Sequence, residues 1–228
     1  MIKLLPILLA VLYGLAMYRF SVWSTKQELD AKSPELAAPI LKVLLDRMAK
    51  ALDIDRIKVN IYEIEPVNGL AAPDGRIFIT RGFFNKYRAG EVTSEEMATV
   101  IAHEMGHVAL GHSRRRMIDF SSQNAMRTAL AMILGRFIPG VGPWIPSGLM
   151  SLLAARLSRS DEFEADAYAS ALLVKAGIGT EPQKSLFRKL ETLTGARGAA
   201  TPAWGLSHPK TPQRIAAIEA NEAKWNAS

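Results

Sequence analysis

The stretch His103-Glu104-Met105-Gly106-His107 contains the pattern HExxH, in a segment whose apolar residues recur at helical spacing. On an α-helix, residues four apart lie on one face, so His103 and His107 can direct two imidazoles at one point. Glu104 directly follows the first histidine and can reach a water molecule bound at that point. The pentapeptide therefore predicts two metal ligands and a general base, which is part of a zinc hydrolase site.

The helix that carries this motif has clear ends in the sequence. Thr93-Ser94-Glu95-Glu96 forms a capping box, in which Thr93 caps the amide of Glu96 and the Glu96 side chain reaches back. The helix is expected to start there and to end near Gly111. Apolar residues share it with the histidines, which predicts a largely buried helix whose polar groups need partners. These apolar residues are Met97, Val100, Ile101, Met105 and Val108.

A catalytic zinc site needs a third protein ligand, and the region just after the motif does not supply one. The metzincin pattern requires a glycine and a histidine where this sequence has Leu110 and Ser113. His112 is one residue out of place for that pattern. We interpret His112 as an ordinary histidine at a helix end, where a cation suits the helix dipole.

A separate acidic stretch, Ser160-Asp161-Glu162-Phe163-Glu164-Ala165-Asp166, offers the missing ligand in the spacing ExxxD. Glu162 and Asp166 share one helical face, so Glu162 can complete the zinc site. Asp166 can then accept the outer imidazole N–H of His103 and select its tautomer. Glu164 is expected to point away into solvent.

Three segments together carry a resemblance to a known family. HEMGH, SRSDEFEADAYA and SHPKTPQRI resemble the gluzincin peptidases of the HtpX and CAAX prenyl protease group, and NGLAAPDGRIFIT resembles the strand and loop before their zinc helix. The similar region covers roughly residues 68–218. The resemblance implies that Glu162 is the third ligand and that His208, in its HP motif, lies near the metal. Those families have several membrane spans and this chain has one candidate, so their substrates are not carried over.

The residues and the resemblance together predict a zinc metalloendopeptidase with one Zn²⁺ per chain that acts on protein or peptide substrates. Zinc would activate a water molecule, and Glu104 would move its proton to the leaving amine. His208 would stabilise the oxyanion or bind zinc reversibly; a loop histidine without a role is the alternative. Arg214 is expected to hold its segment by an ion pair. A membrane-attached chaperone or assembly factor with the same fold and little proteolysis is the alternative function.

The amino-terminal residues are apolar over most of 4–18 and are followed by Phe20, Val22 and Trp23. This pattern predicts a signal anchor or a signal peptide over residues 1–23, with the anchor favoured. Residues 24–228 are then the zinc metallopeptidase domain. The expected location is membrane-anchored with an extracytoplasmic, periplasmic catalytic domain, and the expected role is protein quality control at a bacterial-type membrane.

The remaining patterns predict a mainly α fold with a small β-sheet (α+β), and the resemblance implies that it is of the gluzincin type. The strand just before the zinc helix is expected either to hold a peptide substrate as an edge strand or to belong to an ordinary sheet pair. Residues 129–157 are apolar but interrupted by Pro and Gly, which predicts two short helices forming a lid or a membrane-surface segment. Helices are expected over residues 34–52, 158–175, 180–194 and from 211, and strands over 57–61 and 76–80.

The composition of the chain indicates which kinds of partner and which metal ligands to expect. The chain has 28 Lys and Arg against 22 Asp and Glu, a net charge of +6, which favours anionic surfaces such as lipid headgroups. Nucleic acid is not expected as a partner, because the basic residues are not interleaved with aromatic ones. There is no cysteine, so zinc would have to be held by histidine and carboxylate.

Overall fold

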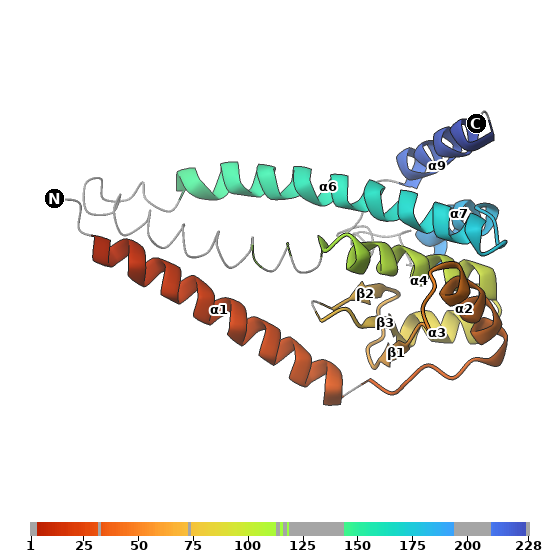
Figure 1. Ribbon diagram of the computed structural model, residues 1–228, viewed down its shortest axis with the longest axis horizontal. Helices are drawn as coiled ribbons and strands as arrows, with labels where there is room; N and C mark the ends of the chain where they lie inside the picture. Colours follow the sequence, from red (N-terminus) through yellow and green to blue (C-terminus); the bar gives the residue numbers. More distant parts are fainter. Residues whose placement is uncertain are drawn as a thin grey trace.

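The computed structural model is mostly helical, with a small three-stranded sheet, which confirms the predicted α+β class (Figure 1). It describes residues 4–31, 33–72, 74–112, 115, 118, 144–193 and 211–226. The helices are α1 (Leu4–Ala31), α2 (Pro39–Ala51), α3 (Arg81–Arg88), α4 (Ser94–Ala109), α6 (Trp144–Lys175), α7 (Glu181–Leu193) and α9 (Thr211–Asn226), and the strands are β1 (Val59–Tyr62), β2 (Gly69–Ala71) and β3 (Ile77–Thr80).

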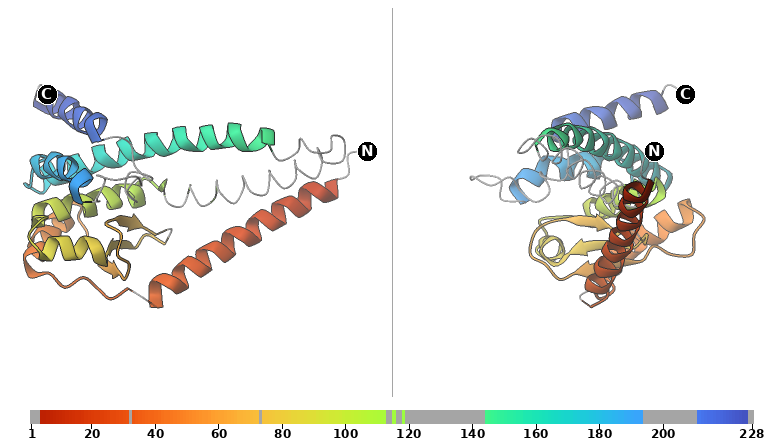
Figure 2. Two further views of the ribbon diagram at one scale, coloured as in Figure 1. Left: turned by 180° about the vertical axis from the view of Figure 1, so that it is seen from behind. Right: turned by 90° about the vertical axis from the view of Figure 1, so that its left-hand side faces the viewer.

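Helix α4 lies at the centre of the described structure. It packs against β2 and β3 on one side and against α6 on the other, while α2 and α7 also contact it (Figures 1 and 2). Helix α9 packs on α6 and α7 on the outer side. Twelve consecutive residues of α4, from Glu96 to His107, are buried. The predicted capping box is present, with both the Thr93 and the Glu96 hydrogen bonds formed, so this helix begins where the sequence predicts.

The sheet has the strand order β1-β3-β2, with β1 parallel and β2 antiparallel to β3. The predicted strands near 57–61 and 76–80 correspond to β1 and β3. Strand β2 was not predicted, because Gly-Leu-Ala has neither alternation nor β-branched residues. Its presence makes β3 the central strand, so the strand nearest the zinc helix in the sequence is not an edge. The edge beside α4 is β2.

The two faces of β3 belong to different apolar clusters. Ile77 and Ile79 join the main core with α4, whereas Phe78 points the other way. Phe78 packs with Leu29, near the end of α1, and with Ala72. The end of α1 is thereby attached to the sheet face opposite the main core.

Helix α3 was not predicted from the sequence. The side chain of Thr80, the last residue of β3, caps α3 by accepting a hydrogen bond from the Phe83 amide at 3.4 Å. At Gly82, an added Cβ would lie 1.7 Å from the carbonyl oxygen of Glu65. The strand can therefore turn directly into a helix because Gly82 has no side chain.

Helix α2 is shorter than predicted, and only part of its apolar stripe faces inward. Residues before Pro39 are extended, and Leu36 and Pro34 form backbone hydrogen bonds with β1. Helical spacing predicts an apolar stripe of Leu36, Ile40, Val43, Leu44 and Met48. Leu44 and Met48 are buried, but Ile40 and Val43 have exposed fractions of 70% and 60%. The buried residues of the helix are Leu41, Leu44, Leu45, Met48 and Ala49.

Helix α6 starts earlier than predicted. The sequence predicted a helix from Ser158, preceded by an interrupted segment over 129–157, but residues 144–157 are the first part of the continuous helix α6. In Figure 1 this part projects away from the compact body, on the side where α1 begins. Residues 129–143 of the predicted segment lie outside the described residues. The starts of α7 and α9 agree with prediction.

Residues 1–23 were predicted to be a membrane anchor or a signal peptide. The chain is helical there, within α1. Across the part of the chain that the structure describes, no helix combines the length and the apolar character that a membrane crossing requires.

Candidate metal centre

Helix α4 presents His103 and His107 on one face, toward α6. Both imidazoles are buried, with exposed fractions of 2% and 3%. Their Nε2 atoms lie 3.1 Å apart. This is the arrangement expected for two histidines one helical turn apart.

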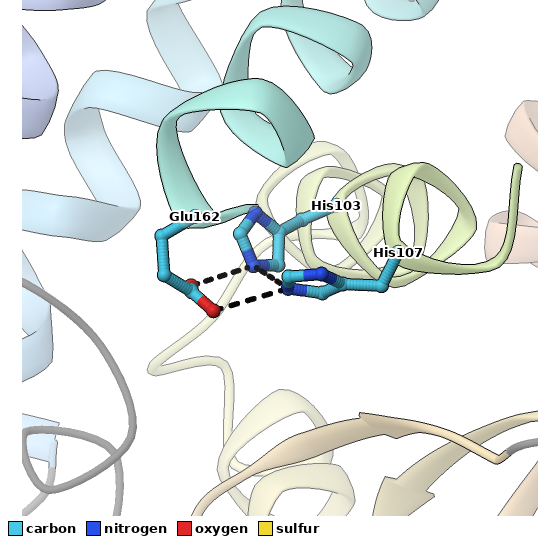
Figure 3. A group of neighbouring side chains, drawn as sticks. All are labelled: His103, His107 and Glu162. Atoms are coloured by element: carbon cyan, nitrogen blue, oxygen red, sulfur yellow. Dashed lines mark hydrogen bonds and ion pairs between the residues drawn. The ribbon is translucent and has the colours of Figure 1, made fainter. Parts of the chain in front are cut away.

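Helix α6 brings Glu162 to the same point. Its carboxylate is completely buried, with Oε2 3.3 Å from Nε2 of His103 and Oε1 3.3 Å from Nε2 of His107. Figure 3 shows the three side chains converging from α4 and α6. They form a group that could hold a metal ion, the single such group among the described residues.

The spacing of these three groups is compatible with a zinc ion. Ligand atoms about 2.0–2.1 Å from a tetrahedral zinc lie roughly 3.3–3.4 Å from one another. Here the two Nε2 atoms are 3.1 Å apart, each lies 3.3 Å from a different oxygen of Glu162, and one ligand atom from each residue lies within 4.8 Å of the others. Two imidazole nitrogens and a carboxylate are also a common ligand set of catalytic zinc. The residues therefore fit the metal in both chemistry and geometry.

A glycine allows α4 and α6 to approach closely enough for this contact. At Gly106, an added Cβ would lie 3.0 Å from both Cα and the carbonyl oxygen of Ala165, which is on α6. The backbone of α6 would have to move away from any larger residue. The fourth residue of HEMGH is therefore part of the reason why Glu162 reaches the histidines.

The outer nitrogen of His103 faces a buried ion pair. Nδ1 of His103 lies 2.9 Å from Oδ1 of Asp166. Asp166 in turn accepts two hydrogen bonds from Arg214 of α9, at 2.7 and 2.6 Å. Arg214 is 1% exposed and lies over the ring of Phe187, 4.1 Å from its centroid. Asp166 thus lies between His103 and Arg214 and contacts both.

Charges around these groups shift their pKa values in opposite directions. Burial alone would raise the pKa of Asp166, but Arg214 and His103 outweigh it and lower the pKa to about 2. Burial alone would lower the pKa of His103, but Asp166 and Glu162 outweigh it and raise the pKa to about 9. The buried carboxylates therefore favour positive charge at His103. A bound divalent cation would benefit from the same electrostatics.

Helix α7 supports the Asp166 turn of α6. Gln183 is completely buried and donates to the backbone carbonyl of Asp166 at 3.3 Å, while it accepts from the Ser170 hydroxyl at 2.7 Å. Gln183 therefore joins α7 to α6.

The outer nitrogen of His107 faces His112, whose Nδ1 is 3.0 Å away. His112 is completely buried, and its Nε2 lies 3.2 Å from Oε2 of Glu164. Our interpretation of His112 as an ordinary helix-end residue is therefore incomplete, since it contacts a candidate ligand. Glu164 is about half exposed, as expected, but is not free of partners.

Glu104, the predicted general base, is 3% exposed and packs beside the start of β2. An added Cβ at Gly69 would lie 3.1 Å from Oε1 of Glu104 and 2.7 Å from Cγ1 of Val100. The first residue of the edge strand must therefore be small. His208, the remaining predicted site residue, lies outside the described residues.

Comparisons with known proteins match this chain to a peptidase family and to several proteases. The sequence model of peptidase family M48 matches residues 35–222. Two similar proteins come from Escherichia coli K12: the metalloprotease LoiP is 30% identical over 75% of this chain and 68% of its own length, and the metalloprotease YcaL is 31% identical over 75% and 65%. A protease HtpX homologue from Bordetella avium is 29% identical over 77% of this chain and 69% of its own. The alignments thus span about two thirds of these relatives.

Proposed function

Because this chain belongs to peptidase family M48, whose metalloproteases hydrolyse peptide bonds, we propose that it is a zinc endopeptidase whose metal is held by His103, His107 and Glu162. The observation that carries this proposal is the convergence of two Nε2 atoms and a carboxylate within 3.3 Å of one another. A bound zinc ion supplies a Lewis acid that acidifies water and polarises a carbonyl group.

The protein's own residues supply the proton transfers. Glu104 takes a proton from the attacking water as its oxygen bonds to the scissile carbonyl carbon. Glu104 then delivers that proton to the amide nitrogen, so that the C–N bond breaks and a free amine and a carboxylic acid are released. Asp166 keeps the proton of His103 on Nδ1, which leaves the Nε2 lone pair for the metal. His208 is our candidate for stabilising the oxyanion or blocking the site by binding the metal.

We propose that protein or peptide substrates bind along β2. This strand is an edge of the sheet, and its first residue lies against Glu104. An extended peptide paired with an edge strand by backbone hydrogen bonds would run past the catalytic residues. The small side chain at Gly69 keeps the strand close to Glu104.

The decisive experiment compares the wild type with Glu104→Gln for zinc content and casein cleavage. Glutamine keeps the size of the side chain but cannot accept the water proton. We expect both proteins to bind about one zinc ion and only the wild type to cleave, with activity reduced by about 10²–10⁴-fold in the variant. Equal cleavage by the two proteins, or a wild type that binds no zinc, would overturn the proposal. Cleavage-deficient protein that prevents casein aggregation would favour the chaperone alternative.

We also propose that α1 attaches the protein to a lipid bilayer, with an extracytoplasmic catalytic domain and a role in protein quality control at a bacterial-type membrane. Support comes from apolar side chains on α1 that are about half exposed, and from bacterial relatives. Flotation with phosphatidylglycerol vesicles, with and without residues 1–23, tests the attachment; a periplasmic reporter fusion tests the side. The exposed residues are Leu8, Leu9, Leu12, Tyr13, Leu15, Phe20 and Trp23.

A further inference from the structure

A turn just after α4 places a third histidine beside the site. Leu110 caps the helix, and Gly111 takes a left-handed conformation with φ of +70°. On a continuing helix, a residue five positions after His107 would lie about 140° around the axis from it. The glycine turn instead places the His112 ring beside the His107 ring, with centroids 5.2 Å apart.

The two ends of the His112 ring contact groups of different kinds. Its Nδ1 lies 3.0 Å from Nδ1 of His107, and its Nε2 lies 3.2 Å from Oε2 of Glu164. Asp161 is farther away, with Oδ1 at 3.7 Å, and that oxygen accepts a hydrogen bond from Arg115 at 2.9 Å. An ionised carboxylate only accepts hydrogen bonds. The Nε2 of His112 is therefore a protonated nitrogen, and in the neutral ring its Nδ1 carries the lone pair.

This assignment determines the tautomer of His107. Two nitrogens 3.0 Å apart can form a hydrogen bond only if one donates and the other accepts. Since Nδ1 of His112 accepts, Nδ1 of His107 donates. The lone pair of His107 is then on Nε2, which faces Glu162 and His103. At this nitrogen a bound metal cation, rather than a proton, would lie between the ring and the carboxylate.

We propose that His112 is a positioning residue for the metal: its buried imidazole donates to Glu164 through Nε2, accepts from His107 through Nδ1, and so holds His107 in the metal-binding tautomer. Asp166 orients His103 in the same way, by direct contact with its Nδ1. Partners in this position typically contribute 10–100-fold to metal affinity or activity. This inference rests on the proposed function, because it assumes that the cluster binds zinc.

Two substitutions distinguish the effect of the His107–His112 hydrogen bond from the effect of the space that the His112 ring fills. His112→Leu fills similar space but cannot accept a hydrogen bond from His107. In His112→Asn the amide oxygen occupies a position close to that of Nδ1 and can accept it. We expect zinc affinity, measured by competition with a chelator, to fall about 10–100-fold in His112→Leu and to recover at least in part in His112→Asn. Thermal unfolding of the metal-free proteins checks that both variants fold.

The contribution of the Glu164 carboxylate to zinc binding can be tested separately. Glu164→Gln removes the charge beside Nε2 of His112, and Glu219→Gln removes a charge from an exposed position on α9 as a matched control. We expect weaker zinc binding in the first variant only. Equal affinities in the two would overturn the part of the proposal that assigns Glu164.

The tautomer of His107 can also be observed by NMR spectroscopy, without measuring activity. The chain contains four histidines, so a ¹⁵N-histidine spectrum of the zinc-loaded protein is simple to assign. The wild type should show an exchange-protected Nδ1 proton on His107, and His112→Leu should lose that protection. If His107 keeps a protected proton and the wild-type zinc affinity in His112→Leu, the role of His112 is wrong. A wild type without zinc affinity would overturn this inference and the proposed function together, whereas equal affinity in the variants would overturn this inference alone.

Discussion

Arg214 has one of the largest fully buried side chains of the described structure. Its guanidinium neutralises the carboxylate of Asp166, which lies behind His103 in the candidate site. Removing one partner of a buried ion pair leaves the other charge uncompensated, which costs about 3–5 kcal/mol. The two residues come from α9 and α6. A single side chain therefore attaches the last helix to the group that orients His103.

We predict that Arg214→Leu lowers the free energy of unfolding of the metal-free protein by about 3–5 kcal/mol, measured by urea denaturation. Arg188→Leu on α7 is the matched control, because Arg188 is an exposed arginine paired with Glu181, and such pairs contribute about 0–1 kcal/mol. Similar losses in the two variants would show that the Arg214–Asp166 pair is energetically ordinary.

At the scale of elements, the central contact is the close packing of α4 on α6. It depends on Gly106, where a side chain would meet the backbone of Ala165. The two helices carry the three candidate ligands between them. Any change in their separation therefore alters the geometry of the metal centre.

Gly106→Ala should weaken zinc binding and lower stability by about 1–3 kcal/mol, the usual cost of overpacking. The intrinsic helix preference of alanine acts in the opposite direction, so a loss would come from packing. Isothermal titration with zinc and urea denaturation measure the two effects. Glu95→Ala, on the exposed side of the same helix, should change neither; unchanged zinc affinity in Gly106→Ala would contradict the packing argument.

A second contact between elements joins the start of α4 to α7. Glu96 is buried, and its carboxylate accepts from Nζ of Lys189 at 2.9 Å and from the Ser185 hydroxyl at 2.7 Å. Burial alone would raise the pKa of Glu96, but Lys189, the Thr93 amide and Ser185 outweigh it and lower the pKa below 4.5. The ionised form is thus favoured in the folded protein.

This shift determines the sign of a pH effect. A carboxylate with a lowered folded pKa stabilises the protein fully above its unfolded value of about 4.5, and the contribution is lost as the pH falls through the folded value. We predict that the wild type loses stability below about pH 4.5 more steeply than Glu96→Gln does. Chemical denaturation at a series of pH values measures both slopes, and parallel profiles would count against this contact.

For the whole molecule, the metal should act as a cross-link between elements distant in the sequence. Ligands from α4 and α6 come together only in the folded chain, so zinc should bind the folded state in preference to the unfolded one. Zinc at a hundred times its dissociation constant would add about 2.7 kcal/mol of stability. We predict that a chelator lowers the melting temperature of the wild type and leaves that of Glu162→Gln nearly unchanged. A wild type that melts at the same temperature with and without chelator would contradict this.

Much of the structure could be predicted where its cause is local. The capping box at Thr93 and Glu96, the four-residue spacing of His103 and His107, and the start of α7 after Thr180 depend on neighbours in the chain. Features that depend on distant segments were missed or misjudged. They include strand β2 and the early start of α6.

The sequence by itself determined the candidate ligand set and the helical frame of this protein, because helical periodicity places side chains on a face whatever the rest of the chain does. It also matched the chain to its peptidase family. Only the tertiary structure decided which groups stand behind those ligands. Arg214 reaches Asp166 from another helix, and the left-handed Gly111 places His112 beside His107. The first contact arises from the packing of distant helices and the second from the exact geometry of a turn, and helical periodicity encodes neither.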